Sequence, residues 1–565
     1  MDILKKIYEK YSVIDILIIV AIILLFSFAY VKHLNFVLPD RGREFLLPQE
    51  ILEGKVPYKD ITLIYFPFAY YINALVYKLL GVKIDSLIIS QAFFCSLYVI
   101  FYYFLSREFL DRFYSFLLSI FIISCCIFAT SDIFSYMIPY SYATVYGLLG
   151  YLICIFGLVK LHKTNNIKYS YLASLSAGFS VCCKLEFLSV ILILILGILL
   201  YKKFNISQYL KMLAAFLVFP VINIIILFIQ GVSVSNIIDA IKFGVKFSKT
   251  GPMTEHLMRS GMYPKALLHN LNDIFKVFQS FITILFFSFV MAKLYKNYKN
   301  LFHIFLICII LWNFYYAPFS AEAYWLLLPL AVLFAFIFLF KNIKSDIPIL
   351  LLLVCALLVA QREFFSLSLM GYGAYALPLL ILSTCVLIDR YASKEILSVS
   401  LKGVVCCFMI VLIGFYSYGI YSSRKETNFL VRSPKGTIYT KFEANYLLYN
   451  TIKYIEDNID KKATVLVLPE GNIINFLTDR KVDMHCFMMD RLYHDAYGEE
   501  KAKSEIEKTK SDYIVLYEGN DVNNFYEPYL YSEYGSLAAR YIFSNYKEVA
   551  NYDNFSGKVK ILKRK

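Results

Sequence analysis

The stretch SVIDILIIVAIILLFSFAYV, residues 12–31, decides the class of fold. It carries a single charge, Asp15, and a helix of this length would be about 30 Å long, which matches the hydrocarbon core of a bilayer. Basic residues precede it, and the following FSFAYVKHLNF contains no small-residue cleavage signal. We therefore interpret it as a retained transmembrane helix and not as a signal peptide.

The composition of the whole chain agrees with this interpretation. Of the 565 residues, 59% are hydrophobic and 17% are charged, whereas about 25% of a soluble domain is charged. So much apolar surface cannot be buried inside one globule. The composition also excludes a disordered chain and a disulfide-rich secreted scaffold.

About thirteen such apolar runs occur, and the fifth and sixth are separated only by Lys184. They are continuous and do not alternate with polar residues, which excludes a transmembrane β-barrel. We expect a polytopic α-helical membrane protein. The runs are residues 12–31, 86–105, 113–130, 138–159, 169–183, 185–201, 210–230, 277–292, 301–318, 323–340, 346–361, 373–389 and 403–421.

Basic residues are unequally distributed between the loops. If the N-terminus is cytoplasmic, the inner segments hold nineteen Lys and Arg, while the short outer loops hold two, Lys184 and Arg362. The positive-inside rule then predicts a multi-pass protein of the cell (plasma or inner) membrane with its C-terminus outside. Because this distribution explains the net charge of +14, we expect no nucleic-acid partner.

Two domains are expected. Residues 1–423 would form the transmembrane domain, with long outer loops at 33–85 and 231–276 that carry amphipathic helices. Residues 424–565 would form a small extracytoplasmic α/β domain, because helical and strand patterns alternate there. The predicted amphipathic helices are 44–54, 67–81 and 236–249, and the predicted elements of the second domain are helices 442–458, 498–510 and 535–545, a helix from Asn472, and strands 463–469, 512–518 and 558–563.

Cysteine and histidine give no sign of a metal centre. Eleven of the twelve Cys lie in apolar runs and Cys486 is alone in the second domain, so no disulfide is expected within that domain. No CxxC or HExxH motif and no glycine-rich nucleotide motif occurs. We expect no structural zinc site and no cofactor, and these patterns leave a divalent metal open.

The candidate site is VLPDRGREFLLPQEILEGKVPYKDITLIYFPFAYYINALVYKLLG, residues 37–81. Asp40 and Glu44 have i, i+4 spacing and would share one face of a helix that starts after Pro39. A carboxylate there could accept a proton from an acceptor hydroxyl, while nearby cations stabilise a departing phosphate. The alternative, which the residues alone favour, is that Asp40 caps that helix, an ordinary role for aspartate.

The same residues resemble the first periplasmic loop of GT-C glycosyltransferases. The shared order is an acidic residue after the first span, then x-x-x-IL-x-G-x-x-PY-x-D, then an aromatic-Pro-x-x-YY helix ending in LLG. The chain is most similar to the protein mannosyltransferase branch, which includes the aminoarabinose transferases of lipid A. VLVLPEGNIINFLTDR, residues 465–480, also resembles segments of that branch.

This resemblance implies transfer of a hexosyl or pentosyl unit, with inversion, from a polyprenyl-phosphate donor to a lipid, glycan or protein acceptor on the outer face. Asp40 matches the family's general base, and Glu44 is the candidate for the second carboxylate that many members place directly beside the base. Many members also carry Lys-Pro-Pro where this chain has Tyr65-Phe66-Pro67. The resemblance implies an enzyme that works without a metal ion, because this branch looks metal-independent. Some other members of the superfamily use a divalent metal.

The donor phosphate therefore needs another partner. Lys184, beside Glu186 in CCKLEF, and Arg362 in QREFF lie at short outer turns, and Tyr65 stands at the position of the family's lysine. A charged side chain at the end of a span can also extend to the water interface and have no role in binding. Candidates for binding the rest of the substrate are Tyr58, Asp60, Tyr70, Glu186 and Arg259.

Each of these candidates has a structural alternative. Tyrosine is common at membrane interfaces, Asp60 could cap a helix, and Arg259 lies in a loop that fits either a flap or a plain surface. A transporter or flippase of lipid-linked glycans would need ionisable residues within the spans, whose middles are almost free of charge. A catalytically inactive scaffold is the other alternative, because Arg41 and Tyr65 depart from the family pattern.

Overall fold

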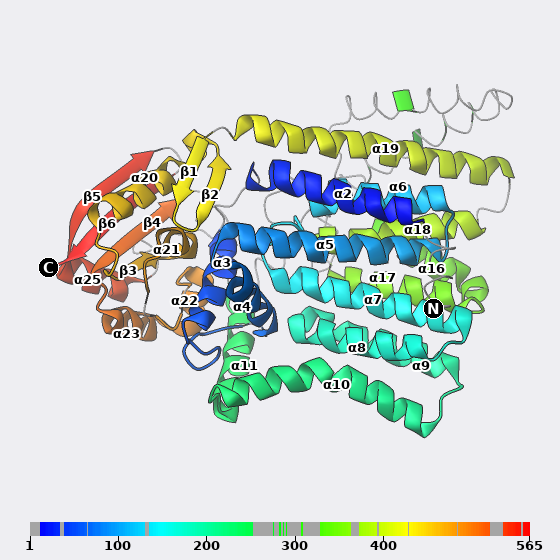
Figure 1. Cartoon of the computed structure of the whole chain (residues 1–565), viewed down its shortest axis with the longest axis horizontal. Helices are drawn as coiled ribbons and strands as arrows, with labels where there is room; N and C mark the ends of the chain where they lie inside the picture. The colour runs from blue at the N-terminus through cyan, green and yellow to red at the C-terminus, as the bar shows by residue number, and fades with distance from the viewer. Residues whose placement is uncertain are drawn as a thin grey trace.

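The transmembrane part is a set of helices that lie side by side (Figure 1). The computed structural model describes residues 12–33, 39–64, 66–129, 135–251, 328–362, 372–391, 395–427, 429–482, 484–486, 488–519, 535–554 and 557–565, with eight isolated positions between 275 and 308. Helices cover eleven of the thirteen predicted runs, and the runs 277–292 and 301–318 lie outside the described segments.

The described helices of this part have the following bounds. They are α2 (Val13–Tyr30), α5 (Ile84–Arg107), α6 (Arg112–Ile122) with a π-helical turn (Ile123–Ile127), α7 (Tyr142–Thr164), α8 (Lys168–Cys183), α9 (Ser189–Tyr201), α10 (Ile206–Ile229), α16 (Leu328–Ile343), α17 (Ile347–Val359), α18 (Leu377–Tyr391) and α19 (Glu395–Glu426).

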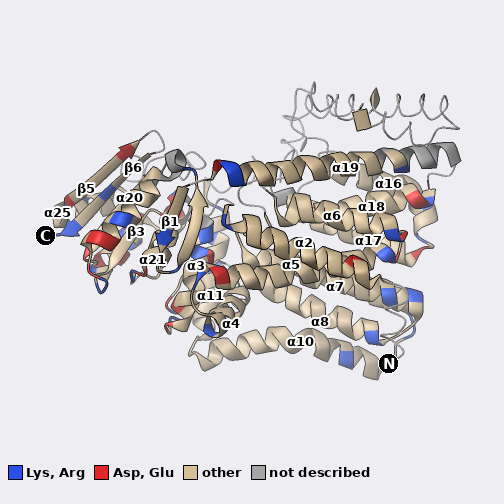
Figure 2. Ribbon diagram, turned by 45° about the horizontal axis from the view of Figure 1, so that its top comes forward, with Lys and Arg blue, Asp and Glu red and all other residues tan. Residues whose placement is uncertain are grey.

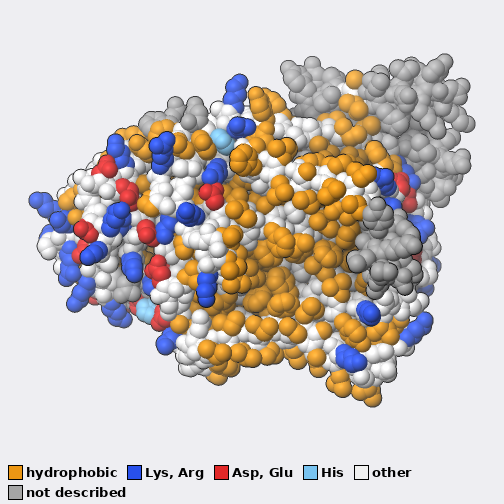
Figure 3. Space-filling view, viewed as in Figure 1, with side chains coloured by type: hydrophobic (Ala, Val, Ile, Leu, Met, Phe, Trp, Pro, Cys, Tyr) orange, Lys and Arg blue, Asp and Glu red, His pale blue; other side chains and the backbone are white. Residues whose placement is uncertain are grey.

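Their surface is that of a membrane protein. Five described helices have the length and composition to cross a bilayer, and the space-filling view shows a broad hydrophobic surface over the helices (Figure 3). The helix α10 exposes most of its apolar side chains, as a helix in contact with lipid would. The protein is therefore a multi-pass helical membrane protein, and thirteen stays the predicted number of spans.

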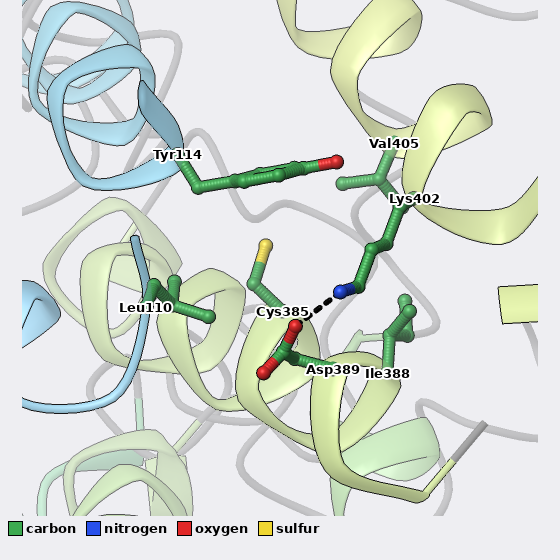
Figure 4. Close-up of a pocket in the computed structure, with 7 residues that line it drawn as sticks. All are labelled: Leu110, Tyr114, Cys385, Ile388, Asp389, Lys402 and Val405. Carbon is green, nitrogen blue, oxygen red and sulfur yellow. Dashed lines mark ion pairs between the residues drawn. The ribbon is translucent and has the colours of Figure 1, made fainter. Parts of the chain in front are cut away.

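Ion pairs occupy the end of the helices that is remote from the C-terminal sheet (Figure 2). Arg112 lies 2.8 Å from Asp15, and Lys402 pairs with Asp389. The second pair borders a small recess between α6, α18 and α19, lined also by Leu110, Tyr114, Cys385, Ile388 and Val405 (Figure 4). Leu110 follows the C-terminal end of α5, so this recess is a helix length away from the candidate site.

Three amphipathic helices lie at the opposite end. They are α3 (Pro39–Leu52), α4 (Phe68–Leu80) and α11 (Val234–Ser248). The stretch 44–54, expected as a separate helix, is the second half of α3 and ends at Gly54, whose φ of +102° suits glycine. In α4 the predicted apolar stripe is exposed at Leu75 and Leu79, while Asn73 on the other side is buried.

The C-terminal region is a four-stranded mixed sheet with covering helices. The strand order is β3-β4-β6-β5, in which β3 and β4 are parallel and the other neighbours are antiparallel. The elements are β1 (Phe429–Ser433), β2 (Gly436–Thr440), α20 (Phe442–Asn458), β3 (Val465–Leu468), α21 (Asn472–Thr478), α22 (Arg491–Tyr497), α23 (Glu499–Thr509), β4 (Tyr513–Gly519), α25 (Ser536–Asn545), β5 (Tyr546–Asn554) and β6 (Gly557–Arg564).

Every element predicted in this region is present, but four others were not predicted. They are the two strands of the β1–β2 hairpin, the short helix α22 and the edge strand β5. The sequence of β5, YKEVANYDN, is mostly polar because an edge strand has one side open to solvent. Its pairing with β6 across a hairpin makes it a strand despite that composition.

The helices α3 and α21 touch through their backbones at Gly42. A Cβ atom built on Gly42 would lie 2.3 Å from the backbone nitrogen of Ile473. One turn further on, the rings of Phe45 and Phe476 are 5.3 Å apart, and the Gln49 amide donates to Asp479 at 3.1 Å. The C-terminal region thus holds the helix that carries Asp40.

We predict that Gly42→Ala destabilises the protein, because the new methyl group must push two backbones apart. Overpacking of this kind costs about 1–3 kcal/mol, which would lower the thermal unfolding temperature in detergent. The control is Gly244→Ala on α11, where a Cβ would meet nothing within 4 Å. Equal unfolding temperatures for the two variants would contradict the tight contact.

Candidate functional site

The charged residues of α3 are buried. Arg41 and Glu44 are each 1% exposed and Arg43 is 3% exposed. Burial of charged groups is costly unless they are paired and hydrogen-bonded. The contacts of these side chains therefore determine how α3 can sit in the protein.

The Glu44 carboxylate joins three elements. The Tyr70 hydroxyl of α4 donates to Oε1 at 2.9 Å, and the backbone N–H of Tyr142, at the start of α7, donates to Oε2 at 2.9 Å. Arg43 Nε lies 3.7 Å from Oε1. With both oxygens engaged and the side chain buried, Glu44 holds α3, α4 and α7 together.

The two arginines connect this carboxylate to the rest of the protein. Arg43 Nη1 donates to the sulfur of Met488 in the C-terminal region at 3.1 Å. Arg41, two residues before Arg43 on α3, is buried as well. A cluster of opposite charges therefore lies between α3, α7 and the C-terminal region.

Lys184 is buried at the turn between α8 and the 3-10 turn Leu185–Leu188. Its ammonium donates to the Tyr140 hydroxyl at 2.5 Å and to Thr144 Oγ1 at 3.3 Å. It also lies 3.3 Å from the Glu186 carboxylate, whose side chain is partly exposed. A cation in this position faces the same end of the helices as α3.

The segment 140–144 links Lys184 to Glu44. Tyr140 and Thr144 contact the lysine, and Tyr142 between them contacts the glutamate. Two residues of chain span at most about 7 Å, so the two charged groups belong to one neighbourhood. The structure therefore brings together four of the candidates, namely Glu44, Tyr70, Lys184 and Glu186.

Asp40 is the second residue of α3. Helical geometry puts positions 40 and 44 on one face. The position lies within the helix and not before it, where a cap stands. The Asp40 side chain is outside the described part.

Two other candidates lie in the turn between α3 and α4. Asp60 accepts a hydrogen bond from the Val56 N–H at 2.9 Å and closes that turn. Tyr58 has a φ of +67°, and burial beside Tyr71 raises the pKa of its hydroxyl above the usual value. The Tyr71 hydroxyl donates to Gln230 at the end of α10 at 2.5 Å.

The remaining candidates are described only in part. The backbone of Arg362 belongs to the 3-10 turn Ala360–Arg362, which contacts the turn Tyr372–Tyr375. The ring of Tyr375 is 6.1 Å from that of Tyr140, beside Lys184. The Arg362 side chain and the residues Tyr65 and Arg259 lie outside the described part.

Sequence reasoning missed several members of the cluster. It assigned no role to Arg43, Tyr140 or Tyr142, and it treated Arg41 as a departure from a family pattern. The adjacent DRGRE charges were a usable signal for the two arginines. No sequence signal connected Met488 with Arg43, because 444 residues separate them.

Within the described residues, no group of three or more His, Cys, Asp or Glu could hold a metal ion.

Comparison with known proteins identified similar structures but no sequence relatives. No protein-family model and no curated protein matches the chain. Among solved structures, ArnT from Cupriavidus metallidurans bound to undecaprenyl phosphate is 12% identical, with a TM-score of 0.46 and 98% of both chains covered. AglB from Archaeoglobus fulgidus in complex with an inhibitory peptide and a dolichol-phosphate is 13% identical, with a TM-score of 0.43, over 98% of this chain and 74% of that one.

A further structure is the Archaeoglobus fulgidus oligosaccharyltransferase in complex with Zn and sulfate. It is 12% identical, with a TM-score of 0.46, over 96% of this chain and 72% of that chain. ArnT and AglB are both members of the GT-C superfamily, the group that residues 37–81 resemble.

We predict that Tyr70→Phe destabilises the protein, because it removes a hydrogen bond to a buried carboxylate. The loss of such a bond costs about 1–3 kcal/mol, measurable as a lower unfolding temperature in detergent. Tyr209→Phe on α10, an exposed position, is the matched control. If the two variants unfolded at the same temperature, the Tyr70–Glu44 bond would contribute nothing to stability.

Proposed function

We propose that the protein is an integral membrane glycosyltransferase that moves a sugar from a polyprenyl-phosphate donor to an acceptor hydroxyl. The observation that carries the proposal is the position of Asp40 on α3, directly before the buried charged residues Arg41, Arg43 and Glu44 and at the same end of the helices as Lys184. A base and several cations at one end of membrane-spanning helices suit a lipid-linked anionic substrate.

In the proposed reaction, Asp40 accepts the proton of the acceptor hydroxyl as its oxygen attacks the anomeric carbon. The bond between that carbon and the phosphate oxygen breaks with inversion, and the lipid phosphate leaves with the bonding electrons. Lys184 and the arginines stabilise the negative charge that develops on the phosphate. Arg362 and Tyr65 are further candidates for this contact, and Tyr58, Asp60, Glu186 and Arg259 for contacts with the rest of the substrate.

Glu44 takes a positioning role in this proposal. Both of its oxygens accept hydrogen bonds from Tyr70 and Tyr142, so its carboxylate is occupied within the protein. By fixing α3 against α4 and α7, it would fix the direction in which Asp40 is presented. Because both Glu44 oxygens are engaged in this way, we assign the acceptance of the proton to Asp40 and not to Glu44.

The charge distribution supports the proposed orientation. The loops rich in Lys and Arg lie at the end remote from the C-terminal region (Figure 2), so the positive-inside rule supports a cytoplasmic N-terminus. The candidate site and residues 424–565 would then lie outside the cell membrane. An acceptor that is a lipid, glycan or protein of the envelope would meet the donor there.

We predict that Lys184→Met raises the KM for the donor by about tenfold or more, because a charge-assisted contact to phosphate is lost. Methionine keeps much of the length of the side chain. Lys78→Met, at an exposed position of α4, is the control. An unchanged KM in Lys184→Met, with the protein folded, would remove Lys184 from the donor site.

We predict that Asp40→Asn lowers turnover of a radiolabelled polyprenyl-phosphate sugar by about 10²–10⁴-fold, because asparagine cannot accept the proton. Binding of the donor should change little, since the substitution preserves shape. Asp239→Asn on α11, which removes an exposed carboxylate, should keep full activity. Full activity in Asp40→Asn would exclude Asp40 as the base, and no turnover by wild type with any donor would contradict the proposed function itself.

A further inference from the structure

The helix α11 carries an exposed apolar stripe. Val234, Ile238, Ile241 and Val245 are between 45% and 60% exposed. Their spacing of four, three and four residues puts all four on one side of the helix. Among the described residues, the stripe is therefore not buried by a neighbouring element.

The other side of α11 is attached to the C-terminal region. Phe247 is buried, and its ring lies 4.7 Å from the ring of Tyr493 on α22. Phe243 lies 6.0 Å from Tyr497 on the same helix. Because these aromatic contacts fix the rotation of α11, the aliphatic stripe must face away from the C-terminal region.

Basic residues lie along one side of the stripe. Lys242 and Lys246 are exposed, and Lys249 follows at the end of the helix. Asp239 is the one acidic residue of α11, and its carboxylate lies 3.7 Å from the Lys242 ammonium in an exposed pair. A narrow aliphatic stripe bordered by lysines is typical of a helix that lies in the headgroup layer of a membrane, where each lysine is attracted to anionic lipid.

The position of α11 along the chain places the stripe at the membrane surface. The helix α10, whose exposed apolar side chains face lipid, ends at Ile229, and the chain turns at Gly231 with a φ of +79°. Ser233 and Asn236 form a capping box that starts α11 directly after this turn. Figure 1 shows α11 running across the direction of α10 at the boundary with the C-terminal region.

We propose that α11 lies in the anionic headgroup layer on the side of the C-terminal region and anchors that region to the bilayer through α22. The stripe enters the lipid, the lysines contact lipid phosphates, and Phe243 and Phe247 carry the attachment to Tyr493 and Tyr497. The partner is a phospholipid surface that contains anionic lipid. This inference does not depend on the proposed activity.

The anchor has a structural consequence for the candidate site. Met488, which accepts the hydrogen bond from Arg43, lies three residues before the start of α22. Holding α22 at the membrane therefore also holds the segment that contacts α3.

The first test places a nitroxide on α11 in the full chain, reconstituted in nanodiscs of phosphatidylcholine with phosphatidylglycerol. Ile241→Cys probes the stripe and Asp239→Cys, on the same helix, is the control, both with Cys308→Ser because that thiol is exposed. We expect the label at 241 to collide with oxygen more than with a water-soluble nickel chelate, and the label at 239 to do the reverse.

Two outcomes would overturn the membrane assignment. Equal access of the nickel chelate to both labels would show that the stripe faces water. A label at 241 shielded from both reagents would show that a second copy or another protein surface covers it. Removal of phosphatidylglycerol should make the label at 241 shallower, and an unchanged depth would exclude a role for anionic lipid.

The second test examines the attachment. The double variant Ile238→Glu with Ile241→Glu should speed hydrogen exchange in the α22 segment 491–497 by roughly tenfold, because a detached α11 no longer restrains it. Val549→Glu, at an exposed aliphatic position of β5, is the matched control and should leave this segment unchanged. Unchanged exchange in the double variant, with an unaltered unfolding temperature, would overturn the anchor.

Discussion

The buried carboxylate of Glu44 is the constraint on which the arrangement of this end of the molecule depends. A carboxylate that is 1% exposed is stable only when its oxygens are hydrogen-bonded and its charge is balanced. The Tyr70 hydroxyl, the Tyr142 N–H and the neighbouring Arg43 meet this requirement. Since these groups come from α3, α4 and α7, satisfying one charge determines how three helices meet.

The C-terminal region completes this arrangement. Its helix α21 packs against α3 so closely that only glycine fits at position 42, and Met488 accepts a hydrogen bond from Arg43. Two further hydrogen bonds join α3 and the loop after it to the C-terminal region. The Gln49 amide donates to the Asp479 carboxylate, and the Lys55 ammonium donates to the carbonyl of Val482. The region is therefore part of the scaffold of the candidate site and not a separate appendage.

The environment of Lys184 in the structure differs from what its place in the sequence suggests. In the sequence it separates two apolar runs, where a lysine could simply reach water. In the structure it is buried, with Tyr140, Thr144 and Glu186 around its ammonium. A buried cation close to the charged cluster around Glu44, at one end of the helices, is a suitable environment for a lipid phosphate, and this supports the proposed function.

The sequence by itself determined the membrane class, the places of eleven described helices, the amphipathic helices between the spans and the main strands of the C-terminal sheet. These properties depend on the length and periodicity of apolar residues, which are local along the chain. Only the tertiary structure decided that Glu44 is enclosed by Tyr70 and Tyr142, that Met488 meets Arg43, and that the polar stretch 546–554 is an edge strand. Such contacts join residues that are far apart in the sequence. A single sequence shows which chemical groups each residue carries, but it does not show which distant residues are in contact.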